Sequence, residues 1–99
     1  MTVITEPEAE HEWNEAVDWY DQREPGVGHR FNAVVRDYLK VLAAQPERFP
    51  LVGRLTRKVK IKDWPYSIFF VVDDEHRQIK VVAVWHGKRN PAELRRRLR

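Results

Sequence analysis

The hydrophobic pattern of the chain changes its period once, near residue 50, and this change limits the folds that are possible. Apolar side chains recur every three to four residues before that point, as on helices, and every second residue after it, as on strands. Pro46 and Pro50 lie at the change, where they prevent a helix from continuing. A chain of 99 residues has room for one hydrophobic core, so we expect a single α+β domain spanning residues 1–99.

Two helices are predicted in the first half. The β-prone segment 2–4 predicts a short N-terminal strand. Thr5 with Glu8 then has the form of a capping box, which predicts a helix start. Pro25 and Gly26 end this helix and leave a short connection, so the two helices should form an antiparallel hairpin. Their apolar stripes comprise Ala9, Trp13, Ala16, Val17 and Tyr20 in the first helix and Phe31, Val34, Val35, Tyr38, Leu39 and Leu42 in the second.

The second half predicts a three-stranded antiparallel meander. Its strands are expected at 54–62, 66–72 and 79–85, with the last two paired in the sheet centre. The first strand alternates between an apolar face, with Leu55, Val59 and Ile61, and a cationic face, with Lys58, Lys60 and Lys62. The helix hairpin should cover the apolar face and leave the lysine-bearing face partly open. Residues 90–93 have the form of a helix start, which predicts a short basic helix or a frayed tail.

Charge is distributed unevenly along the chain. Residues 1–50 carry five Lys and Arg against ten Asp and Glu, whereas residues 51–99 carry thirteen against five. A basic second half favours a polyanionic or acidic partner, because clustered Lys and Arg attract phosphates and carboxylates. The alternative interpretation is a solvated basic face without a partner.

Several function classes are disfavoured by residue content. The chain has no cysteine, which excludes disulfides, thiol nucleophiles and cysteine-ligated zinc. His11–Glu15 begins like a helical zinc motif but lacks its second histidine, so we expect neither a metal nor another cofactor. Ser67 is the only serine and lies within a strand pattern, which makes serine catalysis improbable. Without an apolar run of membrane length or a signal peptide, we expect a soluble chain of the cytoplasm.

The meander is expected to bring basic side chains of its first and last strands onto one concave surface. They are Arg54, Arg57, Lys58, Lys60, Lys62, His86, Lys88 and Arg89. A metal-free ribonuclease needs a base for the 2′-hydroxyl, cations for the phosphorane and an acid for the leaving oxygen. His86 suits the acid or base role, and Arg57, Lys58, Lys60 or Arg89 could hold the phosphate. In the alternative interpretation, His86 bonds the following turn and the lysines protect the sheet from aggregation.

Trp19 stands apart from the other aromatic residues. It precedes Tyr20 directly, and adjacent helix positions cannot both face the core. Trp19 is therefore a candidate contact for a partner.

Several segments together resemble the RelE/ParE superfamily, the toxins of bacterial type II toxin–antitoxin pairs. The resemblance spans nearly the whole chain and is carried by Glu8–Glu10, Ala16–Tyr20, Pro25–Gly28 with Phe31, Pro46–Pro50, Tyr66–Phe70 and Val84–Pro91. It implies a toxin neutralised by a small cognate antitoxin that wraps it with a helix or an added strand.

Two activities exist in that superfamily. RelE-like members cleave mRNA in the ribosomal A site, and by resemblance Lys58, Lys60 and Arg89 would serve that reaction, with His86 replacing a C-terminal tyrosine that this chain lacks. ParE-like members poison DNA gyrase and have no catalytic residue. The helix hairpin and His86–Arg89 resemble the ParE-like branch more closely, so the basic end with Arg95, Arg96 and Arg97 is expected to contact the target. A toxin fold that only binds its antitoxin is the third interpretation.

Overall fold

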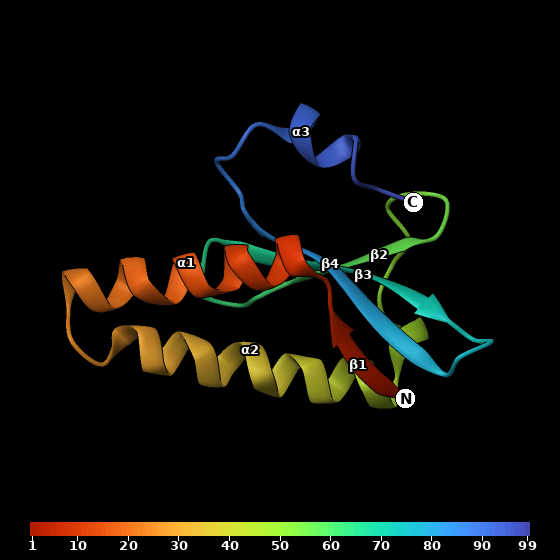
Figure 1. The fold of residues 1–99 in the computed structure, drawn as a ribbon, viewed down its shortest axis with the longest axis horizontal. Helices are drawn as coiled ribbons and strands as arrows, with labels where there is room; N and C mark the ends of the chain where they lie inside the picture. The colour runs from red at the N-terminus through yellow and green to blue at the C-terminus, as the bar shows by residue number, and fades with distance from the viewer.

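The computed structural model describes all of residues 1–99 and consists of a helix hairpin, a mixed four-stranded sheet and a short C-terminal helix (Figure 1). The order of elements is β1 (Thr2–Thr5), α1 (Pro7–Arg23), α2 (Val27–Ala44), the 3₁₀ turn η1 (Pro46–Arg48), β2 (Thr56–Lys60), β3 (Tyr66–Asp73), β4 (Gln78–His86) and α3 (Pro91–Arg95). The predicted α+β class, helix hairpin, meander and C-terminal helix are confirmed.

The sheet has the strand order β1-β4-β3-β2. β2, β3 and β4 form the predicted antiparallel meander, with β3 and β4 in the centre. β1 confirms the predicted N-terminal strand and adds a parallel edge beside β4, a pairing that the sequence pattern did not predict. Its pairing covers only residues 78–81 of β4, so the end of β4, residues 82–86, has no strand on that side. The candidate site lies against this uncovered edge.

The start of α1 differs from the prediction. The N-cap is Glu6 and makes no side-chain capping bond, while Pro7 takes the first helical position. Thr5 is instead the last residue of β1, paired with Val81 of β4, so the predicted capping box of Thr5 and Glu8 is wrong. The parallel pairing of β1 holds Thr5 in an extended backbone and moves the helix start along the chain.

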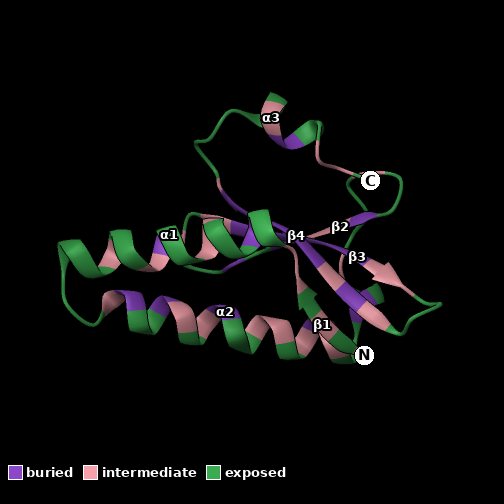
Figure 2. Ribbon diagram, viewed as in Figure 1, coloured by how far each residue is buried: buried purple, intermediate pink, exposed green.

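The main core lies between the helix hairpin and one face of the sheet. Phe31, Val35 and Leu42 of α2 are fully buried there, with Ile68 and Phe70 of β3. Burial is concentrated on the central strands and on the inner faces of α1 and α2, whereas the outer face of α1 is exposed (Figure 2). The two helical stripes predicted from the sequence therefore pack as expected.

The first predicted strand is shorter than expected, and Leu55 is not part of the core. Its exposed fraction is 57%, because 52–55 form bends and regular pairing begins only at Thr56. Thr56 is fully buried, and its backbone N–H donates to the carbonyl oxygen of Arg99 at 2.9 Å. Figure 1 shows this loop beside the C-terminus.

The second face of the sheet, expected to be partly open, is covered by the C-terminal segment. Leu94 and Leu98 pack there on a second apolar cluster that includes Phe69, Val82 and Trp85. α3 begins as predicted, with the side-chain oxygen of Asn90 accepting from the N–H of Ala92 at 2.9 Å. The C-terminal segment thus buries apolar side chains that the central strands place on this face.

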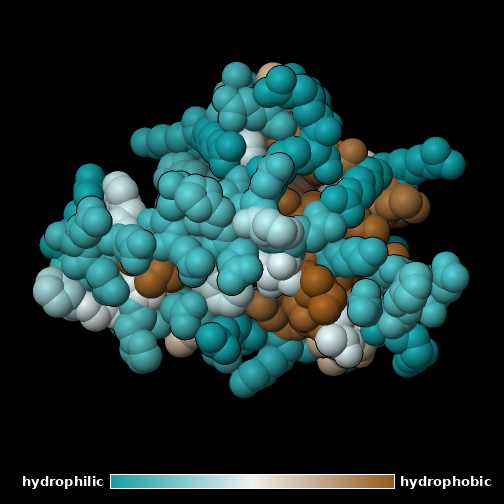
Figure 3. All heavy atoms as spheres, in the orientation of Figure 1, coloured by the Kyte–Doolittle hydropathy of each residue, from teal (hydrophilic) through white to brown (hydrophobic).

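No helix of the chain is long and apolar enough to span a membrane. Polar side chains cover α1 and much of the face shown in Figure 3, and apolar atoms gather over the strands.

Candidate functional site

The sheet separates the cations that were expected to converge. Lys58 is paired with Phe69 and Lys60 with Ser67, which places both lysines on the face covered by α3. His86 is paired with Tyr66, whose ring belongs to the core on the helix side. Because side chains alternate between the two faces of a strand, His86 lies on the opposite face from both lysines. The predicted single concave surface is therefore wrong.

The remaining cations of β2 and its flanks also lie apart. Arg57 points to the helix side and donates to the carbonyl oxygen of Phe49 at 2.7 Å. Lys60 donates to the carbonyl oxygens of Ile61 and Trp64. Arg54 precedes β2 and Lys62 follows it, and both are exposed. None of these side chains lines the cleft that contains His86.

Arg89 is held by its own chain. Its guanidinium pairs with Glu12 at 2.5 Å and with Glu93 at 3.3 Å, and it lies 3.8 Å above the Trp85 ring. Its Nε and Nη2 donate to Glu93 and its Nη1 donates to Glu12, so each guanidinium nitrogen already has a carboxylate partner.

Arg97 has a structural role. It pairs with Glu12 at 2.7 Å and Glu8 at 3.0 Å, and it donates to the carbonyl oxygen of Val82 at 2.5 Å. Burial alone lowers the pKa of Arg97, but the hydrogen bonds and charges of Glu12, followed by Glu8, raise it overall. Arg95 and Arg96 are exposed and make no ion pair, so of the predicted tail residues only these two are free to contact a target.

Glu12 was not predicted as a site residue. Its carboxylate is only 9% exposed and receives the N–H of Val84 at 3.1 Å in addition to both arginines. Together with Arg97, Glu12 fills backbone positions on the edge of β4 that β1 leaves unpaired. Helical spacing assigns Glu12 to the acidic outer surface of α1, and no local signal identifies partners more than 70 positions away.

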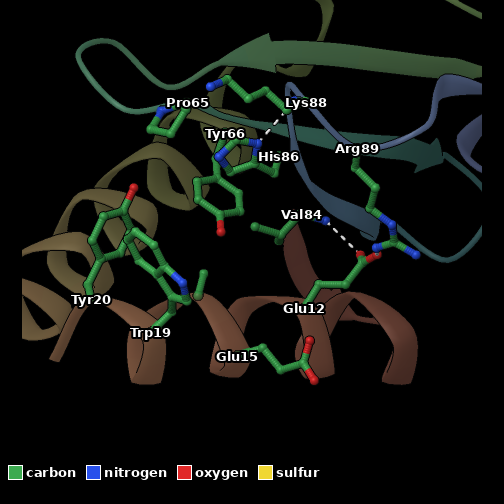
Figure 4. A pocket seen from close by; sticks show the side chains of 11 residues that line it. Glu12, Glu15, Trp19, Tyr20, Pro65, Tyr66, Val84, His86, Lys88 and Arg89 are labelled. Carbon is green, nitrogen blue, oxygen red and sulfur yellow. Dashed lines mark hydrogen bonds and ion pairs between the residues drawn. The ribbon is translucent and has the colours of Figure 1, made fainter. Parts of the chain in front are cut away.

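A cleft of about 610 Å³ lies between α1 and the ends of β3 and β4 (Figure 4). Glu12, Glu15, Trp19 and Tyr20 of α1 line one side, and Tyr66 and His86 line the other. Lys88 and Arg89 stand at its rim. Much of the lining is aromatic or aliphatic, with a few polar groups, as is typical of binding pockets. We call this feature the aromatic cleft.

His86 accepts a hydrogen bond from the N–H of Lys88 through its Nδ1 at 3.0 Å. The neutral ring therefore carries its proton on Nε2. Its ring also meets the Tyr66 ring edge-on, with centroids 5.0 Å apart. These contacts match the interpretation of a strand-end histidine that bonds the following turn.

Tyr66 presents a protonated hydroxyl to the cleft. Burial raises the pKa of Tyr66, and the charges of Tyr20 and Glu15 raise it further. In Figure 4 the ring extends from the strands toward α1, with its hydroxyl between Tyr20 and Val84. It is suited to donate a hydrogen bond rather than to act as a base.

The model of the family "ParE toxin of type II toxin-antitoxin system, parDE" matches residues 3–91. The chain belongs to this family. Two solved structures resemble the fold of this ParE-family chain. A chain of the chromosomal ParDE toxin–antitoxin system of P. aeruginosa has a TM-score of 0.75 at 17% identity, over 87% of this chain and 95% of that one. The isolated E. coli RelE toxin has a TM-score of 0.63 at 20% identity, over 96% and 93%. No curated protein matches the sequence significantly.

No group of three or more His, Asp or Glu side chains of this ParE-family chain is placed to hold a metal ion. No lysine of β2 lies on the same side of the sheet as His86, and the only arginine of β2, Arg57, donates to the carbonyl oxygen of Phe49. The arrangement provides an aromatic surface with charged rims, which can receive another molecule.

Proposed function

We propose that this ParE-family chain is the growth-inhibiting toxin of a type II toxin–antitoxin pair and acts on DNA gyrase in the cytoplasm. The family match supports the toxin assignment. The fold does not distinguish the two targets, because it resembles both a chain of a ParDE system and RelE, and the gyrase target is our inference. A cognate antitoxin would neutralise it.

We choose gyrase over mRNA as the target because His86 is separated from Lys58 and Lys60. General acid–base cleavage of RNA needs the proton-transfer groups and the phosphate-binding cations within hydrogen-bond reach of one phosphate. Here a sheet lies between them, and Arg89 is paired with two carboxylates. A toxin that acts through protein contact needs no such constellation.

The exposed Arg95 and Arg96 are our candidates for the gyrase contact, since neither is paired within the chain. Deleting the whole tail is a poor test, because it would also remove Leu98 and Arg97 from the sheet face and from Glu12. The double substitution Arg95→Ala with Arg96→Ala leaves those contacts in place.

The test is a DNA-cleavage assay with purified chain, gyrase, ATP and supercoiled plasmid. We expect linear plasmid after detergent and protease treatment, and at least severalfold less with the Arg95→Ala, Arg96→Ala variant. His86→Ala should retain the effect. Intact plasmid, together with new A-site cuts in mRNA in a reconstituted translation reaction, would reverse the choice of target. Inactivity in both assays would favour a fold that only binds its antitoxin.

A further inference from the structure

A second cavity, of about 360 Å³, lies where β1 meets the two helices of the hairpin. Its walls come from residues 3–5 of β1, from α1 and from α2, and none of its lining residues belongs to the aromatic cleft. Figure 1 shows β1 running from beside the end of α2 to the start of α1, across this junction. Helix positions 10, 13 and 14 point away from positions 12, 15 and 19, so the cavity and the aromatic cleft lie on different sides of α1. We call this cavity the hairpin pocket.

The polar side chains that line the hairpin pocket make no hydrogen bond or ion pair within the chain. They are Thr5, Glu10, Asn14, Asn32 and Arg36. The indole nitrogen of Trp13, another lining residue, is the only buried side-chain nitrogen or oxygen of the chain without a hydrogen-bond partner. Buried polar groups of folded proteins are nearly always paired, so the chain by itself leaves this wall incompletely satisfied.

Opposite charges line the hairpin pocket but do not pair with each other. Glu10 and Asn14 lie one turn apart on α1, and Asn32 and Arg36 lie one turn apart on α2. Each helix therefore contributes one charge and one amide. The guanidinium of Arg36 lies 6.0 Å from the centre of the Trp13 ring and forms no ion pair with Glu10. The hairpin pocket thus offers both charges to a ligand that carries both, whereas a simple anion would meet the carboxylate of Glu10.

The rest of the lining is apolar and comes from β1 and from Trp13. Val3 and Ile4 belong to this wall, and Ile4 is 41% exposed, so its side chain is available to a ligand. A volume of about 360 Å³ is near the lower end of the range for ligand pockets. These properties favour a small zwitterion with an apolar side chain.

We propose that the hairpin pocket binds a free α-amino acid with an apolar side chain. The carboxylate of the ligand accepts hydrogen bonds from Arg36 and from the side-chain amide of Asn32. Its ammonium group donates to Glu10 and to the side-chain oxygen of Asn14, and its side chain packs against Ile4. The proposal rests on the hairpin pocket alone and does not depend on the target of the toxin.

The test is a titration of the full, isotope-labelled chain followed by NMR. The reporters are the indole N–H of Trp13 and the side-chain amides of Asn14 and Asn32. The probe is L-leucine, and three comparison ligands each lack one of its groups. N-acetyl-L-leucine lacks the ammonium group, L-leucinamide lacks the carboxylate, and glycine lacks the side chain. We expect leucine to shift the three reporters in a saturable way and to leave the indole signal of Trp19, in the aromatic cleft, unchanged.

The comparison ligands separate the parts of the proposal. N-acetyl-L-leucine and L-leucinamide should each bind about three- to fivefold more weakly than leucine, as expected for loss of one exposed ion pair. Glycine should bind at least about tenfold more weakly, because it buries no aliphatic side chain. Glu10→Gln should remove the difference between leucine and N-acetyl-L-leucine, and Arg36→Gln should remove the difference between leucine and L-leucinamide.

Arg30→Gln is the matched control, because Arg30 is an exposed arginine of α2 that does not line the hairpin pocket. It should leave every affinity unchanged. The proposal is overturned if leucine shifts none of the three reporters at millimolar concentration, or if N-acetyl-L-leucine and L-leucinamide bind as tightly as leucine. Tighter binding of the dipeptide leucylglycine than of leucine would identify a peptide-binding site and would also overturn it.

Discussion

Glu12 joins three parts of the chain that are distant in sequence. Its carboxylate receives the backbone N–H of Val84, the guanidinium of Arg89 and the guanidinium of Arg97. The tail is thereby tied to α1 and to the unpaired edge of β4. The arginines of the tail therefore differ in role. Arg97 stabilises the fold, whereas Arg95 and Arg96 are exposed and unpaired.

Arg97→Ala should lower the free energy of unfolding by about 2 kcal/mol, because it removes one of the two arginines that neutralise a nearly buried carboxylate. Arg95→Ala is the matched control and should change it by less than about 0.5 kcal/mol, since Arg95 is exposed and unpaired. Urea denaturation followed by tryptophan fluorescence measures both. Equal effects of the two substitutions would contradict a structural role for Arg97.

Asp73 gives a pH dependence of known sign. The backbone N–H and then the side chain of His76 lower the pKa of Asp73 below its ordinary value, with a further contribution from Lys80. A lowered pKa in the folded state means that the ionised form stabilises the fold above the unfolded pKa and that this stabilisation is lost as the pH falls.

The stability advantage of the native chain over Asp73→Asn should therefore be largest near neutral pH and should shrink on acidification toward about pH 3. Urea denaturation of both chains at several pH values measures it. A constant difference across that range would show that ionisation of Asp73 does not stabilise the fold.

The close approach of α1 and α2 depends on one glycine. A Cβ at Gly28 would overlap the backbone carbonyl oxygen of Val17 and lie 2.6 Å from Cγ of Asp21. The N–H of Gly28 donates to Asp21 at 2.8 Å, which ties the start of α2 to α1. Gly26 has a different role. It is the last residue before α2 and has a φ of 93°, in the left-handed region, and a Cβ built there has no atom within 4 Å.

Gly28→Ala should lower the free energy of unfolding by about 2–3 kcal/mol, since a backbone atom must move to admit the methyl group. Gly26→Ala, the matched control, should cost only about 1 kcal/mol for its positive φ. Thermal or urea unfolding of the two variants gives the ranking. A larger loss for Gly26→Ala would contradict tight packing at Gly28.

Elements whose signal is local could be predicted from the sequence. The helix hairpin and the central strands β3 and β4 follow from apolar spacing and turn residues, and the start of α3 follows from Asn90 and Pro91. The parallel pairing of β1 and the placement of α3 on the second sheet face could not be predicted. Both depend on contacts with β4 that are far away in sequence, and periodicity contains no information about them.

The expectation that the basic side chains share one surface with His86 failed for a related reason. Alternation correctly placed Lys58 and Lys60 on one face of β2, but the face of His86 depends on its register with Tyr66. The β-bulge between Phe69 and Phe70 lies along the same pair of strands, so counting residues from the sequence does not give that register.

Part of the basic charge of the second half of the chain forms ion pairs within the molecule. The basic tail lies against the acidic start of α1 through Arg97 with Glu8 and Arg99 with Glu6, at 3.0 Å and 2.6 Å. Fewer cations therefore remain for a partner than the sequence suggests. The sheet also isolates the lysines of β2 from the aromatic cleft, which supports the proposal of protein contact over that of RNA cleavage.

The most direct test of this central claim is controlled expression in a bacterium, with pulse-labelling of DNA and protein synthesis and mapping of mRNA 5′ ends. We expect DNA synthesis to stop first, with double-strand breaks and intact mRNA, in both the native chain and His86→Ala. Early loss of translation with new A-site cuts that His86→Ala abolishes would contradict it.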